Sequence, residues 1–262
     1  MSRPEYSAPP EVFYNDTESS KYTENTRVQQ IQAEMTLRAL ELLNLGPGQF
    51  MLDIGCGSGL SGEILTQEGH HWVGMDISAS MLANALDRDI EGDLMLSDIG
   101  QGIPFRAGSF DAAISISAIQ WLCNADSSHA DPKKRLQRFF QTLYASLKRG
   151  GKAVCQFYPS NQQQIDQISH AAKLTGFGGG LVIDGADSKK HKKYYLVLTA
   201  GEGAEDLNLQ GVQIEASHSR KKRKGQETTK EFIARKKESM RKRGKVVALD
   251  SKYTGRKRKA QF

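Results

Sequence analysis

Short apolar runs alternate with amphipathic segments along the first 200 residues. The apolar runs have the length of buried strands, and the amphipathic segments repeat their apolar residues at helical spacing. Strands are predicted at residues 50–54, 71–77, 93–99, 112–116, 153–158, 181–184 and 194–199. Helices are predicted at residues 26–45, 60–68, 79–89, 132–147 and 162–174. Strands that alternate with helices form a mostly parallel sheet covered on both faces, and the last two strands are expected to pair as an antiparallel hairpin.

A glycine-rich segment, Gly55-Cys56-Gly57-Ser58-Gly59, joins the first strand to a helix that begins at Leu60. Glycine permits unusual backbone angles and lets a ligand approach the backbone closely. Strand, glycine turn and helix in this order are typical of a nucleotide-binding α/β domain. Seven strands with a late hairpin are the arrangement of a Rossmann-like class I S-adenosyl-L-methionine-dependent methyltransferase. We therefore predict an α/β protein of this class with a basic C-terminal extension.

Charge divides the chain into two parts. Residues 217–262 hold 18 Lys and Arg against 4 Asp and Glu, whereas the other 216 residues hold 18 against 26. Such a basic block indicates a phosphate-rich partner, a nuclear import signal, or both. We predict an N-terminal arm or lid at residues 1–23, a methyltransferase domain at 24–200, a linker at 201–216 and a basic tail at 217–262. Thr26 is expected to cap the first helix of the domain.

Cysteine use and hydropathy restrict the protein class further. Cys56, Cys123 and Cys155 are scattered and odd in number, which fits a reducing compartment and gives no zinc or disulfide pattern. No apolar run reaches membrane-spanning length, and the N-terminus lacks a basic-then-apolar signal peptide. We expect an intracellular protein with no metal site and no membrane partner.

Candidate ligand-binding residues stand at the ends of the predicted strands, where open α/β sheets bind ligands. The first strand ends in the glycine segment, whose amides can approach a methionine carboxylate or a ribose. The second strand ends in Asp76-Ile77, and a carboxylate at that position can accept hydrogen bonds from both ribose hydroxyls. These positions predict a site for the sugar of a nucleoside.

The next two strand ends extend this site. Asp98 can accept a hydrogen bond from an adenine amine while Ile99 packs on the ring, and Ser115 would stand beside the sulfonium. A single acid would be a weak signal, but three successive strand ends together favour a binding site for S-adenosyl-L-methionine. The candidate cofactor-binding residues of the strand ends are Gly55, Cys56, Gly57, Asp76, Ile77, Asp98, Ile99 and Ser115.

A dinucleotide-binding enzyme is the main alternative on the same pattern. Its fingerprint is Gly-x-Gly-x-x-Gly, whereas the third glycine here comes one position early, at Gly59. Asp53 precedes the loop and a second acid, Asp98, ends the third strand. These differences favour S-adenosyl-L-methionine over NAD.

The segment after the fourth strand indicates which atom is methylated. Residues 115–122 read Ser-Ile-Ser-Ala-Ile-Gln-Trp-Leu, without the Asn/Asp-Pro-Pro-Tyr/Phe clamp of many amino-group methyltransferases and without an acid or histidine as general base. Guanine N7 needs no base, because its ring lone pair attacks the methyl group directly. Trp121 can stack on an extruded base and Gln120 can bond its edge. The alternative, Trp121 as core and Gln120 as helix surface, stays open.

The third strand lies at the edge of the sheet if the strand order is 3-2-1-4-5-7-6. An apolar edge strand invites pairing with another chain. Leu94, Met95 and Leu96 are therefore candidates for contact with a partner. Ordinary packing under a helix is the alternative.

Several segments together resemble one known family. They are residues 27–43, the glycine loop, Asp98-Ile99 through Ile103-Pro104-Phe105, Ile119-Gln120-Trp121-Leu122 and the closing residues 250–259, Asp-Ser-Lys-Tyr-Thr-Gly-Arg-Lys-Arg-Lys. Nearly end to end, the chain is similar to the eukaryotic 18S rRNA (guanine-N7) methyltransferases. This family includes the human Williams–Beuren syndrome region methyltransferase and the yeast bud-site-selection methyltransferase.

The resemblance implies a substrate, a partner and a lid. The substrate would be one guanosine of 18S rRNA in a pre-40S ribosomal particle, and the protein would act in the nucleus (nucleolus and nucleoplasm), with the cytoplasm as a second location. A small zinc-binding protein that activates several methyltransferases would add a strand to the edge proposed above. Tyr22 and Arg27 would belong to the lid over the cofactor.

Two other functions are compatible with the sequence. One is a small-molecule methyltransferase whose basic tail only directs nuclear import. The other is a ribosome-assembly factor whose presence matters more than its catalysis.

Overall fold

A computed structural model describes residues 4–125, 130–185 and 192–201, with single positions at Ala234, Lys237, Arg241, Val247 and Leu249. Residues 126–129 of the polar loop, residues 186–191 of the basic hairpin loop and nearly all of the predicted linker and basic tail lie outside the described residues. By backbone contacts the chain divides into two compact units, Met1–Ile214 and Glu215–Phe262. The seven-stranded sheet lies in the first unit.

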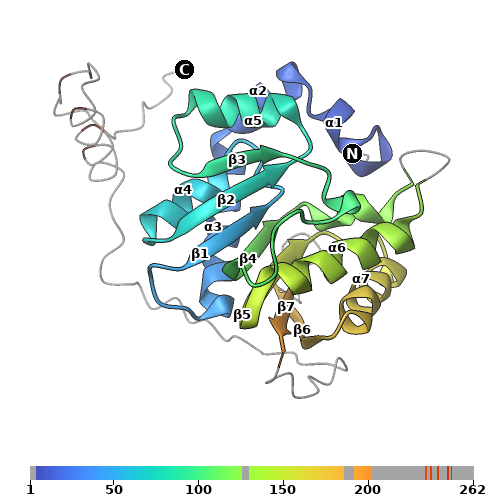
Figure 1. Ribbon diagram of the computed structural model, residues 1–262. Coiled ribbons are helices and arrows are strands. Elements are labelled where there is room, and N and C mark those ends of the chain that lie inside the picture. Colours follow the sequence, from blue (N-terminus) through green and yellow to red (C-terminus); the bar gives the residue numbers. More distant parts are fainter. Residues whose placement is uncertain are drawn as a thin grey trace. The chain divides into compact units, whose positions relative to one another are not determined.

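Seven strands form one sheet in the order β3-β2-β1-β4-β5-β7-β6 (Figure 1), as the sequence predicts. The strands β1 to β5 run parallel, β7 pairs antiparallel with β5, and β6 pairs antiparallel with β7. Their bounds are β1 Phe50–Ile54, β2 His71–Asp76, β3 Asp93–Leu96, β4 Phe110–Ile116, β5 Leu147–Phe157, β6 Phe177–Asp184 and β7 Lys193–Ala200. The seven-stranded α/β prediction is confirmed.

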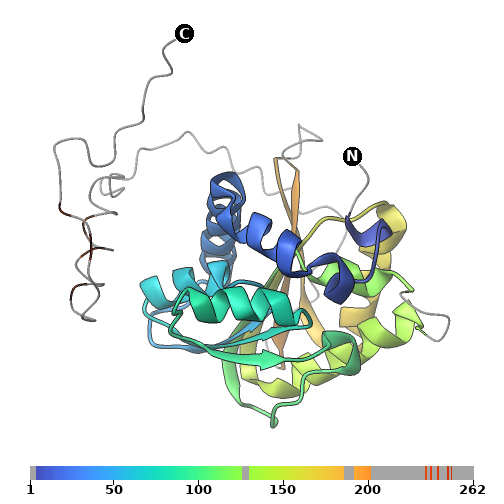
Figure 2. The same ribbon diagram turned by 90° about the horizontal axis from the view of Figure 1, so that it is seen from above.

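Helices cover both faces of this sheet (Figures 1 and 2). The helices are α1 Pro10–Phe13, α2 Asp16–Glu24, α3 Thr26–Leu43, α4 Leu60–Gln67, α5 Ala79–Asp87, α6 Pro132–Ser146 and α7 Gln162–Leu174, with the short 3-10 helices η1 Pro4–Tyr6, η2 Ile99–Gln101 and η3 Ile119–Cys123. One apolar cluster joins α6 and α7 to the sheet, and a second joins α3, α4 and α5 to the opposite face. Two layers of helix thus enclose the parallel strands, so their ends are what remains accessible to a ligand.

The helix α6 shows how the sequence fixes this packing. Asp131 caps it by accepting hydrogen bonds from the amides of Lys133 and Lys134, and Pro132 occupies its first turn. Its buried residues, spaced three and four apart, are Leu136, Phe139, Phe140 and Leu143. Each contributes roughly 1.5–3 kcal/mol by leaving water. The amphipathic pattern therefore decides which face of α6 meets the sheet.

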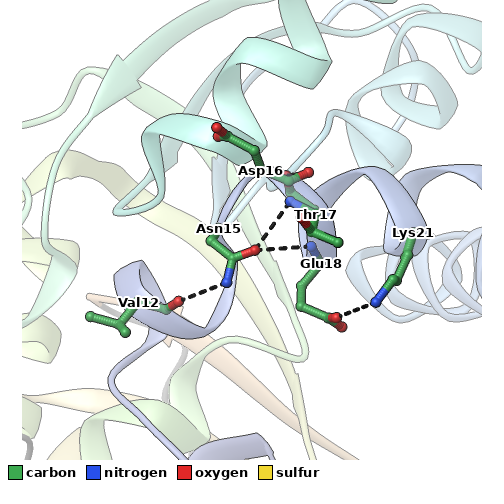
Figure 3. Close-up of polar contacts among 7 residues, drawn as sticks. Val12, Asn15, Asp16, Thr17, Glu18 and Lys21 are labelled. Atoms are coloured by element: carbon green, nitrogen blue, oxygen red, sulfur yellow. Dashed lines mark hydrogen bonds and ion pairs between the residues drawn. The ribbon is translucent and has the colours of Figure 1, made fainter.

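The N-terminal residues form three short helices that lie at the end of the sheet where the parallel strands terminate (Figures 1 and 2). Asn15 begins α2, because its carboxamide oxygen accepts hydrogen bonds from the amides of Thr17 and Glu18 while its nitrogen donates to the carbonyl of Val12 (Figure 3). Such a cap stabilises a helix by about 1 kcal/mol. The same device starts α3: Asn25, not Thr26 as predicted, is the cap.

Three strand boundaries differ from the sequence prediction. The strand β3 ends at Leu96, so Asp98, which caps η2, and Ile99, its first residue, lie beyond the strand. The strand β5 begins at Leu147, directly after α6, and so contains the two glycines that were expected to precede it. The glycines 178–180 lie within β6. Glycine lowers strand propensity but does not forbid pairing with a neighbouring strand.

Within residues 4–125, 130–185 and 192–201 no helix combines the length and the apolar character needed to cross a bilayer. The same described part of the chain contains no cluster of three His, Cys, Asp or Glu side chains that could hold a metal ion.

Candidate active site

A cleft opens at the carboxyl ends of β1, β2 and β4 and holds about 830 Å³, including open solvent at its mouth. We call it the strand-end cleft. Eight of the ten predicted cofactor-binding residues line it: Tyr22, Gly55, Cys56, Gly57, Asp76, Ile77, Asp98 and Ile99.

The glycine loop is shaped by close backbone contacts. Gly55 has φ +73°, and a Cβ atom there would stand 2.3 Å from the Cβ of Ala118. Gly57 has φ +53°, and its amide donates a 2.8 Å hydrogen bond to the Asp76 carboxylate. The backbone of the loop therefore forms the floor of the cleft, with the N-terminus of α4 next to it.

Asp76 connects the loop to the end of β2. Its second carboxylate oxygen accepts a 2.8 Å hydrogen bond from the amide of Ser78. Burial raises the pKa of Asp76, and the hydrogen bonds from Ser78 and Gly57 oppose that rise. A carboxylate has about four acceptor positions, so acceptor capacity remains for two ribose hydroxyls.

Asp98 also lines the cleft and caps η2 through the amide of Gly100. Arg135 of α6 donates to the same carboxylate oxygen at 3.0 Å. This ion pair is partly buried and fixes the carboxylate beside Ile99. Arg135 also lines the cleft, which the sequence did not indicate.

Two predicted cofactor residues do not line the cleft. Arg27 lies exposed in the first turn of α3. Ser115 is fully buried within β4, and its hydroxyl has no hydrogen-bond partner. Ser117, two residues later, lines the cleft with φ +59° and donates through its hydroxyl to Gln156. The chain turns out of the strand between these two serines, so the later one reaches the ligand space.

A second pocket adjoins the strand-end cleft; we call it the adjacent pocket. It holds about 880 Å³, including open solvent. Five residues line both spaces: Tyr14, Tyr22, Gln32, Ser117 and Trp121. Both predicted substrate residues, Gln120 and Trp121, line the adjacent pocket.

Both of these residues are buried, because the N-terminal helices cover η3. Trp121 is 7 % exposed, with its ring 5.9 Å from that of Tyr14 and 6.1 Å from that of Phe13. Gln120 is 5 % exposed, so the alternative placement on a helix surface is wrong. Its amide nitrogen donates a 2.8 Å hydrogen bond to the carbonyl of Ser117.

Tyr14 and Tyr22 bring the N-terminal segment to the site. Ser78 donates a 2.7 Å hydrogen bond to the carbonyl of Tyr14, and Gln32 donates 2.6 Å to the hydroxyl of Tyr22. The two rings meet edge to face at 5.8 Å. Burial raises the pKa of both tyrosines above the usual value, so their hydroxyls stay protonated at neutral pH.

Sequence reasoning missed several cleft residues: Tyr14, Gln32, Ser97, Ser117 and Arg135. Tyr14 carried a signal, because four aromatic residues stand in the polar N-terminal segment. Arg135 carried none, since its position on α6 reads as an ordinary exposed charge.

The predicted partner strand β3 is an edge of the sheet and pairs with β2 alone among the described strands. Leu94 and Met95 are half-buried against the two apolar clusters. Leu96 is 60 % exposed, and Leu86 of the neighbouring helix α5 is 69 % exposed. The edge thus presents apolar surface next to an open strand.

Comparisons with known proteins agree with this fold. A family profile described as a methyltransferase domain matches residues 52–155, and one described as a methyltransferase involved in Williams-Beuren syndrome matches residues 184–260. Phosphoethanolamine N-methyltransferase 2 of Haemonchus contortus, solved with S-adenosylhomocysteine, shares 20 % identity and a TM-score of 0.55 over 72 % of this chain and 58 % of that one. The fold and site define a class I S-adenosyl-L-methionine-dependent methyltransferase.

A curated relative shows to which family of methyltransferases the chain belongs. The 18S rRNA (guanine(1575)-N(7))-methyltransferase of Saccharomyces cerevisiae is 64 % identical over 275 aligned residues, which cover 100 % of both chains. This chain belongs to the family of 18S rRNA (guanine-N7)-methyltransferases. A Haloferax volcanii methyltransferase, solved in complex with the Trm112 methyltransferase activator, shares 18 % identity and a TM-score of 0.50 over 71 % of this chain and 97 % of that one.

Proposed function

We propose that this chain methylates N7 of a guanosine in 18S rRNA of the pre-40S ribosomal particle. The observation that carries the proposal is the connection between the strand-end cleft and the adjacent pocket through Ser117 and Trp121. One space suits the methyl donor and the other suits a base removed from the RNA stack. Membership in the 18S rRNA (guanine-N7)-methyltransferase family supports the same reaction.

The residues of the strand-end cleft fit S-adenosyl-L-methionine. Asp76 would accept from the ribose hydroxyls, and Asp98 with Ile99 would hold the adenine. The glycine-loop amides, next to the N-terminus of α4, would face the methionine carboxylate, with Tyr22 covering it. When bound, S-adenosyl-L-methionine supplies an electrophilic methyl group on a sulfonium.

The protein's own contribution to this reaction is orientation and exclusion of water. Ser117 and Trp121 at the junction would align N7 with the methyl group, and Tyr14 would close the junction from the N-terminal side. The N7 lone pair forms the new bond, so no residue has to remove a proton. An acid in the pocket is therefore free to act in recognition rather than as a base.

We expect 7-methylguanosine to disappear from 18S rRNA of cells that lack the protein and to return when the wild-type chain is restored. Mass spectrometry of digested 18S rRNA measures this directly. Activity on free metabolites with unchanged rRNA would favour the small-molecule alternative. An inactive, cofactor-free variant that fully restored small-subunit maturation would show that an assembly role operates without catalysis.

We further propose that β3 binds the small zinc-binding activator. Support comes from the exposed apolar edge and from the Haloferax neighbour, whose activator partner is named in its structure. Leu96→Lys places a charge on this edge and should weaken the complex at least tenfold, since burial of one leucine contributes about 1.5–3 kcal/mol. Co-purification, with zinc quantified per chain, measures the loss.

Leu174→Lys is the matched control, because Leu174 is 64 % exposed at the end of α7, away from β3. It should leave co-purification unchanged. Retention of the zinc protein by Leu96→Lys would show that the activator binds elsewhere.

The basic tail, residues 217–262, is proposed to direct nuclear import and to contact RNA phosphates. Its 18 Lys and Arg against 4 acids support this role. The arm or lid at residues 1–23, the methyltransferase domain at 24–200 and the linker at 201–216 complete the proposed organisation.

A further inference from the structure

The adjacent pocket contains two buried acceptor atoms without partners. Oε1 of Gln120 and Oε2 of Glu5 are both inaccessible to solvent, and neither has a hydrogen bond. The side-chain nitrogen of Gln120 donates a hydrogen bond to the carbonyl of Ser117, so only the side-chain oxygen of Gln120 still lacks a partner. A buried acceptor without a hydrogen bond destabilises the folded protein, because the acceptor has lost its contact with water. The presence of both acceptors in one pocket indicates a ligand that brings hydrogen-bond donors.

Glu5 is held in this pocket by the fold. Its carbonyl accepts a 3.0 Å hydrogen bond from the side chain of Asn124, which follows η3 directly. Its carboxylate is close enough to Tyr14 to raise the pKa of that tyrosine, after burial, together with Asp76. The N-terminal segment thus carries an acid into the lining of the adjacent pocket, and this acid does not line the strand-end cleft.

Among nucleobases, guanine matches a carboxylate and an amide oxygen best. Its Watson–Crick edge presents two neighbouring donors, N1–H and the 2-amino group, whereas adenine presents a ring-nitrogen acceptor there. N7 lies on the opposite edge of guanine. A guanine whose N1 and 2-amino groups face Glu5 and Gln120 can therefore direct N7 toward the junction with the strand-end cleft.

We propose that Glu5 is the specificity-determining residue for guanine, with Gln120 as the second acceptor and Trp121 and Tyr14 as the apolar walls. This inference rests on the proposed function and deepens it. Methyl transfer breaks the sulfur–carbon bond and forms the N7–carbon bond, no proton leaves, and the positive charge passes from sulfur to the guanine ring. A carboxylate beside the ring stabilises that charge more in the transition state than in the ground state.

The test compares Glu5→Gln and Glu5→Ala with the control Glu24→Gln, which changes an exposed acid at the end of α2. Full-length variants methylate pre-40S particles taken from cells that lack the protein, and calorimetry gives their affinity for S-adenosyl-L-methionine. We expect Glu5→Ala to lower kcat/KM for the particle roughly 10- to 100-fold, the range of a lost charged hydrogen bond. The kcat/KM of Glu5→Gln should fall by a smaller factor, and that of Glu24→Gln should equal the wild-type value.

Cofactor affinity separates recognition from a structural role. It should stay within about twofold of wild type in all three variants. Wild-type rates in both Glu5 variants, or a parallel loss of cofactor affinity, would overturn the proposal. Failure of the wild-type chain itself to methylate the particle would instead contradict the proposed function.

A second measurement tests the 2-amino contact alone. The monophosphates of 7-methylguanosine and 7-methylinosine differ by that group, and each is used as a competitor of the particle. Wild type should be inhibited at least several-fold more strongly by the guanosine form, and Glu5→Ala should respond to both equally. An undiminished preference in Glu5→Ala, or no preference in the wild type, would count against Glu5.

Discussion

Replacing Asp76 by alanine is expected to weaken binding of S-adenosyl-L-methionine roughly 10- to 150-fold, or about 1.5–3 kcal/mol for a lost charged hydrogen bond. Two effects add to this loss. The carboxylate no longer meets the ribose, and the amides of Gly57 and Ser78 lose their acceptor, so the glycine loop is no longer fixed. Isothermal calorimetry on the full-length chain measures the affinity.

Asp76→Asn and Asp87→Ala complete this experiment. The asparagine keeps one acceptor oxygen and should lose less affinity than alanine. Asp87 is exposed at the end of α5, so its removal should change nothing. If Asp76→Ala bound the cofactor as tightly as wild type, Asp76 would not be a ribose ligand and the strand-end cleft would need another occupant.

Replacing Asp53 by asparagine is expected to stabilise the protein at pH 8 but not at pH 4. Asp53 lies in β1 and is fully buried; Ser61 donates 2.6 Å to one of its oxygens, and the other oxygen has no partner. Burial raises the pKa of Asp53 to about 7, the hydrogen bond from Ser61 opposes the rise, and the Asp76 charge adds to it.

The sign follows from proton linkage. Between pH 4 and 7 the folded state holds a proton on Asp53 that the unfolded state releases, so the free energy of unfolding falls as pH rises. The fall is about 1.4 kcal/mol per pH unit, or on the order of 4 kcal/mol over three units at most. Asparagine is uncharged at every pH, so Asp53→Asn lacks this pH dependence of the free energy of unfolding.

Urea unfolding at pH 5 and pH 8 measures the difference. From pH 5 to pH 8, the free energy of unfolding of the wild type should fall by about 2–3 kcal/mol relative to that of Asp53→Asn. The fall occurs between pH 4 and pH 7, and two of these pH units lie above pH 5. The exposed variant Asp87→Asn should keep the wild-type slope. Equal slopes for Asp53→Asn and wild type would mean that Asp53 is already ionised in the folded protein at pH 5.

The sheet order was predictable because each strand carries its own pattern and the connections obey few rules. Parallel strands with helical crossovers and a late hairpin leave one common topology, and the order of all seven strands agrees. Boundaries were less predictable. Gly150 and Gly151 read as a break, and although they lie within β5 its pairing with β4 shifts register there, between Leu147 opposite Phe110 and Lys152 opposite Ala112.

The candidate site likewise contains residues that the sequence predicted and residues that it did not. Gly57, Asp76 and Asp98 were predictable because strand ends meet at one edge of a parallel sheet. Ser115 was misplaced because it lies inside β4 and is fully buried, and the path of the chain after the strand decides which serine reaches the cleft. Glu5 and Tyr14 could not be placed, because their partners Asn124 and Ser78 stand 119 and 64 residues away in sequence.

These long separations in sequence determine when the N-terminal segment can fold during translation. Residues 4–24 leave the ribosome before their partners and can contact them only when Ser78 and then Asn124 have emerged. At roughly 5–20 residues per second, the wait up to Asn124 lasts about 6 to 24 seconds. During that interval Phe13, Tyr14 and Tyr22 have no folded domain to cover them. A nascent chain thus becomes able to retain its methyl donor only after Arg135, which holds Asp98 in the cleft, has also been translated.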